Sequence, residues 1–132
     1  MDEIIKFTKT GKGQVCLYSS GIMHQTYEKG IDLEFQDSLD EFEIYKDGYC
    51  DEKRRPILVD LENLKTVSKE SRGIYSSEET VKYFTAAALL VGNPVSRIMG
   101  NFYLGINKTA MPIKMFTKKD EAISWLKDFI ND

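Results

Sequence analysis

Apolar side chains change their spacing along this chain, and the change separates two kinds of element. In the first 28 residues, short apolar-rich runs are interrupted by glycine-containing turns, which predicts strands at residues 3–9, 14–19 and 22–28. Further on, apolar residues recur every three or four positions, as on one face of a helix: Phe35, Leu39, Phe42, Tyr45 and Tyr49. Asp32 is expected to cap this helix, and Gly48 is expected to end it.

Continuous apolar runs mark the second half of the chain. The run in residues 54–61 predicts a strand that is buried on both faces, as in a parallel sheet sheltered by helices. Two further inner strands are expected at residues 86–92 and 111–117, the last of them near a sheet edge because of Pro112. Helices are expected between and after these strands, at residues 69–77, 78–87 and 94–106 and after Thr117.

The predicted helices carry recognisable start signals. Ser68 is a candidate N-cap, and so is Ser76 or Ser77, with Glu79 at capping-box spacing from Ser76. Pro94 is a favourable first helical residue. Thr117 is the candidate N-cap of the last helix, with Asp120 completing its capping box. The last helix has its inner stripe at Ala122, Ile123, Leu126, Phe129 and Ile130, with Trp125 beside it. Strands therefore come first, and strand and helix then alternate three times. This order predicts an α/β fold, with a mixed sheet of about five strands and helices packed against it.

Length and charge restrict the class of protein. A chain of 132 residues suggests one domain, residues 1–132. The net charge is −3, and the only basic triplet, residues 53–55, follows two acids, so we expect no nucleic-acid partner. The longest apolar run, residues 86–91, is too short to cross a membrane. The N-terminus has no apolar signal core, so a cytoplasmic location is expected.

Candidate catalytic and metal-binding side chains are sparse. Cys16 and Cys50 are isolated, which favours a reduced pair, and one histidine without a Cys-x-x-Cys motif argues against zinc. His24 is expected to be a half-exposed strand residue, and we expect no catalytic residue, metal or cofactor. The acids of the first helix are expected to form a solvated face rather than a calcium loop: Glu34, Asp37, Asp40 and Glu41.

One stretch of the sequence resembles a known family. The strand "ILVDL", the link "ENLKTVS" and the serine-bearing helix start "KESR" resemble the STAS domain family, the fold of anti-sigma factor antagonists. The stretches "ALLVGNPVSRIMGNFYLGINK" and "PIKMFTKKDEAISWL" resemble small bacterial proteins of the SpoIIAA-like type. The resemblance covers about residues 14–130 and is strongest over 56–130. It implies a STAS/SpoIIAA-like fold and a non-enzymatic regulatory or protein-interaction module with a protein partner.

The resemblance also points to a site at the start of the second predicted helix. On the family's Asp-Ser-Ser-Gly motif, Ser68 falls on the Asp, Glu70 on the phosphorylated Ser and Ser71 on the Gly. We expect Ser68 to be a helix cap near the surface, with Glu70 beside it in a protein-contact corner; regulated phosphorylation of Ser68 or Ser71 is the competing hypothesis.

A second candidate surface lies in the helix predicted at residues 94–106. Phe102, Tyr103 and Leu104 are bracketed by two glycines, and part of this cluster could contact a partner or a ligand. The alternative function is therefore a domain that binds a small molecule, a lipid or a nucleotide, in an apolar pocket near residues 98–104. The sequence leaves a homodimer open.

Overall fold

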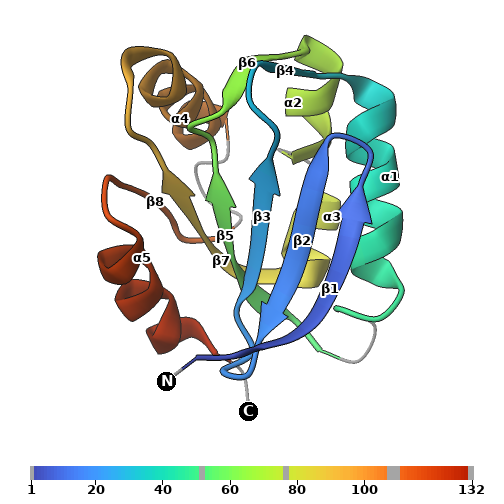
Figure 1. Cartoon of the computed structure of the whole chain (residues 1–132), viewed down its shortest axis with the longest axis vertical. Helices are drawn as coiled ribbons and strands as arrows, with labels where there is room; N and C mark the ends of the chain where they lie inside the picture. The colour runs from blue at the N-terminus through green and yellow to red at the C-terminus, as the bar shows by residue number, and fades with distance from the viewer. Residues whose placement is uncertain (1, 51–52, 76–77, 107–110, 131–132) are drawn as a thin grey trace.

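The computed structural model describes residues 2–50, 53–75, 78–106 and 111–130, except for the side chains of Tyr75, Glu79 and residues 102–106. Its main sheet has six strands in the order β1-β2-β3-β5-β7-β8 (Figure 1). These strands are β1 (Ile4–Thr10), β2 (Gly13–Tyr18), β3 (Met23–Tyr27), β5 (Arg55–Asp60), β7 (Phe84–Leu90) and β8 (Ile113–Phe116). The pairs β1–β2 and β2–β3 are antiparallel, and the other three are parallel. The predicted mixed α/β sheet is confirmed, with six strands instead of five.

Two short strands form a separate parallel pair, β4 (Ile31–Leu33) with β6 (Leu64–Val67). The helices are α1 (Phe35–Lys46), α2 (Lys69–Tyr75), α3 (Glu78–Tyr83), α4 (Pro94–Ile106) and α5 (Lys119–Leu126), and a 3-10 turn, Lys127–Phe129, follows α5. Within the described ranges, no helix is both long and apolar enough to serve as a membrane span.

Helices cover both faces of the main sheet, as the continuous apolar strands predicted. Side chains alternate along a strand, so Leu58 and Ala88 point to one face and Ile57 and Ala87 to the other. Helix α5 packs on the first face (Figure 1), where Ala86, Ala88, Ala122 and Leu126 are fully buried. Helix α1 packs on the opposite face, where Phe42 and Tyr45 meet Ile57 and Phe84.

Some helix boundaries differ from the sequence-based expectation. Asp32 does not cap α1, because β4 pairs with β6 and so delays the helix to Phe35, with Glu34 as the N-cap. The third predicted helix ends at Tyr83, where β7 begins two residues earlier than expected, because Phe84 enters the sheet as the partner of Arg55.

The end caps give a mixed result. The last helix is capped at Lys118 rather than at Thr117, and Asp120 accepts a hydrogen bond from Glu121 N–H within its own first turn. Gly48 does follow the end of α1, with a φ of +108° that an L side chain rarely adopts. Ser76 and Ser77 lie outside the described residues.

Candidate interaction site

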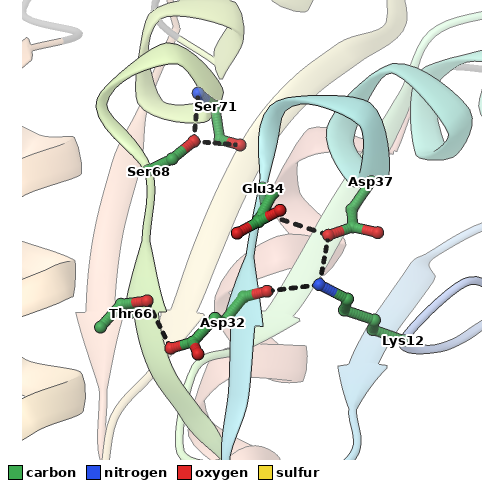
Figure 2. A network of polar contacts seen from close by, with 7 residues as sticks. All are labelled: Lys12, Asp32, Glu34, Asp37, Thr66, Ser68 and Ser71. Atoms are coloured by element: carbon green, nitrogen blue, oxygen red, sulfur yellow. Dashed lines mark hydrogen bonds and ion pairs between the residues drawn. The ribbon is translucent and has the colours of Figure 1, made fainter.

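Strands β4 and β6 place the starts of the helices that follow them, α1 and α2, next to each other. Leu33 is opposite Val67 in this parallel pair, and Ser68 N–H extends the ladder by donating to the Leu33 carbonyl oxygen at 2.9 Å. Helix α1 begins two residues after Leu33, and α2 begins two residues after Val67. Because parallel strands end at the same edge, the two helix starts become neighbours (Figure 2).

A polar network holds the start of α1 in place (Figure 2). Glu34 N–H donates to Asp37 Oδ2 at 2.9 Å, as in a capping box. Lys12 Nζ reaches the same carboxylate at 2.9 Å and also the Asp32 carbonyl oxygen at 2.7 Å. The hydrogen bond to Asp37 raises the pKa of the Lys12 ammonium. Thr66 Oγ1 donates to Asp32 Oδ1 at 2.6 Å, which ties β6 to β4. The start of α1 is therefore anchored to both sheets.

Ser68 caps α2, as the sequence predicts. Ser71 N–H donates to Ser68 Oγ at 3.1 Å, and Ser68 Oγ donates in turn to Ser71 Oγ at 3.0 Å (Figure 2). Ser68 is half-buried and Glu70 is exposed, which fits the expected corner. Ser71 does not fit it, because its exposed fraction is 0%. Its place in the first turn points it toward the core, so only Ser68 and Glu70 are left at the surface.

An apolar groove of about 670 Å³ lies between α1, α2 and α3. Nine residues line it: Phe35, Leu39, Phe42, Glu43, Lys46, Glu70, Gly73, Ile74 and Tyr83. Phe35 and Leu39, which the sequence placed on the apolar face of this helix, are 45% and 38% exposed. The first half of that face lies in the groove beside α2, and only the second half reaches the sheet.

The groove joins the corner that the sequence singled out. Glu70 contributes to both, since it lies in the first turn of α2 and also lines the groove. At Gly73 a Cβ atom would have no neighbour within 4 Å, so the backbone there adjoins open space. Glu43 and Lys46 lie on the α1 side, with Lys46 Nζ 3.5 Å from Glu43 Oε1. The result is a solvent-exposed apolar surface with charged residues at its edges.

The second candidate surface is described only in its backbone. Phe102, Tyr103 and Leu104 belong to α4, but their side chains lie outside the described part of the chain. Val95 and Ile98, earlier on the same helix, are exposed.

His24 is buried, with an exposed fraction of 8%, and is not the half-exposed residue expected from the sequence. Its Nδ1 lies 2.8 Å from the Tyr18 hydroxyl oxygen, because the β2–β3 hairpin places both side chains on the α5 face. Burial, followed by the charge of Lys119, lowers the pKa of His24 to about 4. Cys16 is opposite His24 across the strands, and burial raises the pKa of its thiol. Both cysteines are free, as expected.

These groups form a buried polar cluster and offer no open reaction site. In the ranges that the structure describes, no group of three or more His, Cys, Asp or Glu side chains is placed to hold a metal ion.

The sequence analysis missed the groove, although one signal for it was present. A glycine inside a helical pattern, here Gly73, costs helix stability, and it can be present for a reason of packing or function. The exposed positions on α1 could not be found in this way, because their spacing matches that of a core stripe.

The arrangement of strands and helices is that of a SpoIIAA-like α/β fold. A similar solved structure is an uncharacterised DUF3478-family protein with a SpoIIAA-like fold from Shewanella loihica PV-4. Its TM-score is 0.57 at 14% identity, over 96% of this chain and 95% of that one, so the expected fold is confirmed. Residues 16–130 match the family model described as "Domain of unknown function (DUF7793)", and the chain belongs to that family.

A second solved structure, a protein of unknown function from Arthrobacter sp. FB24, is 31% identical over 85% of this chain and 96% of its own. Its TM-score with this chain is 0.30. No curated protein matches the chain.

Proposed function

We propose that this protein is a non-enzymatic interaction module that binds a partner protein in the groove between α1, α2 and α3. The observation that carries the proposal is the exposure of Phe35 and Leu39, two large apolar side chains, within a groove that is lined largely by apolar residues. Exposed apolar surface of this kind is costly in water and commonly marks a binding site for another protein.

The arrangement of the groove supports a protein partner. It runs along the side of α1 for its full length, from Phe35 to Lys46. Its edges carry Glu43 and Glu70, charges that a protein surface can pair with. Ser68 stabilises α2 as its cap and thus fixes the position of Glu70, so the corner and the groove act as one surface.

The state of the reactive side chains supports a role without catalysis. A nucleophilic cysteine needs an accessible thiolate, whereas Cys16 is buried and its thiol pKa is raised by burial. His24 is buried as well, and its neutral form engages Tyr18. A general base of this kind would have no path to a substrate.

Site-specific cross-linking in the cells that make the protein tests this proposal. A photo-reactive phenylalanine derivative replaces Phe35, where an aromatic ring is already exposed. The matched control carries the same derivative at Ser124, an exposed position on α5. We expect irradiation to give one discrete protein adduct from position 35 and none from position 124.

A second variant links that adduct to the groove. Gly73→Leu starts from a position where a Cβ atom meets nothing within 4 Å, so we expect its side chain to occupy the groove. The adduct from position 35 should disappear in this background. If the adduct persists, or if it forms instead from a derivative at Ile98 on α4, the groove is not the binding site.

A further inference from the structure

We propose that the partner segment bound in this groove is a basic amphipathic helix. This inference rests on the proposed function and specifies the chemistry of the partner. It follows from the distribution of charge around the groove, from the length of the groove and from the open space at Gly73.

Carboxylates outnumber cations among the charged residues that line the groove, which are Glu43, Lys46 and Glu70. Outside the lining, Glu34, Asp40 and Asp47 are exposed on or beside α1, Lys69 is exposed on α2, and α3 carries exposed Glu78 and Lys82. Lys46 already lies 3.5 Å from Glu43, which partly neutralises it. The edges of the groove therefore present net negative charge, and a segment with lysine or arginine beside its apolar residues is complementary to them.

The same charges disfavour two other occupants. A second copy of the chain, packed groove to groove, would bring the acidic side of α1 against its own equivalent, and like charges at close range oppose association. A membrane surface rich in anionic lipids would be repelled for the same reason. The same acidic side chains that oppose a second copy of the chain and an anionic membrane would attract a basic partner segment.

The dimensions suit a helix. The α1 side of the groove extends over the 12 residues of that helix, which corresponds to roughly 18 Å, or about three helical turns. A partner helix can place apolar residues at i, i+3 or i+4, and i+7 along this length. Gly73 leaves open space on the α2 side of the groove for the partner's side chains, because no side chain of this chain projects there.

A pair of synthetic peptides tests the inference on the intact protein. Both are amphipathic helices of about 16 residues with the same leucine face, and the other positions are lysine in one and glutamate in its twin. Binding is followed by fluorescence anisotropy of labelled peptide at low and moderate salt. We expect the lysine peptide to bind at least about tenfold more tightly than its twin, and to weaken as salt rises.

Variants of the protein locate this binding. Gly73→Leu should remove it, and the double change Glu43→Lys with Glu70→Lys should shift the preference toward the glutamate peptide. Glu121→Lys with Asp128→Lys changes the net charge equally at exposed positions in and after α5 and should preserve the preference for lysine.

Three results would overturn the inference: equal binding of the two peptides, binding by neither, or lysine-peptide binding that survives Gly73→Leu. None of these results would bear on the proposed function, which is tested separately by the cross-link from position 35. If that cross-link is lost, the proposed function itself fails. A cross-linked partner segment that is acidic or not helical contradicts only the present inference.

Discussion

Helices α1 and α5 lie on opposite faces of the same sheet, and both have an amphipathic sequence. In α5 the inner stripe packs against the sheet along its length. Ala122 and Leu126 are fully buried, and Ile123 and Trp125 are partly buried beside them. In α1 the stripe is divided, because Phe42 and Tyr45 contact the sheet whereas Phe35 and Leu39 remain exposed. An apolar stripe that continues beyond the surface it covers is a sign of a binding site, and it is the basis of our account.

The largest expected difference in stability is between two leucine-to-alanine substitutions, one on α5 and one on α1. Leu126→Ala should lower the free energy of unfolding by about 2–5 kcal/mol, because it leaves a cavity under α5. Leu39→Ala should cost less than about 1 kcal/mol, since the side chain is already partly in water. Urea denaturation of the two variants measures both. Equal losses would mean that Leu39 is a core residue and that the groove is closed in solution.

The α5 face should also be sensitive to pH through His24. Its pKa of about 4 in the folded state lies below the value of 6.5 for an unperturbed histidine. Between these values the unfolded chain binds more protons, so the His24 contribution is complete above pH 6.5 and is lost as the pH falls toward 4. From pH 7 to pH 5 the loss should be about 2 kcal/mol.

The control for this prediction is His24→Gln, which retains a neutral polar side chain. Carboxylates titrate in both proteins, so the difference between the two pH profiles isolates the histidine. Parallel profiles for the wild type and the variant would show that His24 titrates normally in the folded protein.

A smaller effect is expected at the corner where α2 begins. Ser68→Ala should lower stability by about 1 kcal/mol, because Ser71 N–H loses its cap. Ser124→Ala, at an exposed position on α5, should change it by less than about 0.5 kcal/mol. Thermal melts of both variants provide the comparison. If Ser68→Ala is as mild as Ser124→Ala, the cap does not stabilise α2.

The smallest effect should have the opposite sign. Gly73→Ala should stabilise the protein by about 0.5–1 kcal/mol, because Gly73 lies within α2 and a methyl group would meet nothing within 4 Å. Chemical denaturation would detect the gain. A loss of stability would mean that the space beside Gly73 is filled in solution.

Some elements of the fold could be predicted from the sequence, and others could not. Strands β5 and β7 were predictable because their continuous apolar runs allow little except burial on both faces. Ser68 was predictable as a cap because capping depends on local spacing. Strands β4 and β6 were not, since three or four residues carry too little periodicity and their pairing joins residues that are distant in the sequence.

The exposure of the first half of the α1 stripe could not be predicted for a related reason. Phe35 and Phe42 have the same helical spacing whether or not a sheet lies beneath them, and only the placement of α1 beside α2 separates their environments. The burial of His24 and Glu41 was missed in the same way. Glu41 was expected in water but accepts a hydrogen bond from the Tyr27 hydroxyl at 3.1 Å in the interior. Which polar groups are buried is decided by tertiary contacts.

The most direct test of the account is the affinity of the cross-linked partner for two variants at one position. Calorimetry with the purified partner should give the same dissociation constant for Gly73→Ala as for the wild type, since a methyl group leaves the groove open. Gly73→Leu should bind at least about tenfold more weakly while retaining its cooperative unfolding. Unchanged affinity in a folded Gly73→Leu protein would show that the partner binds elsewhere and would contradict the central claim.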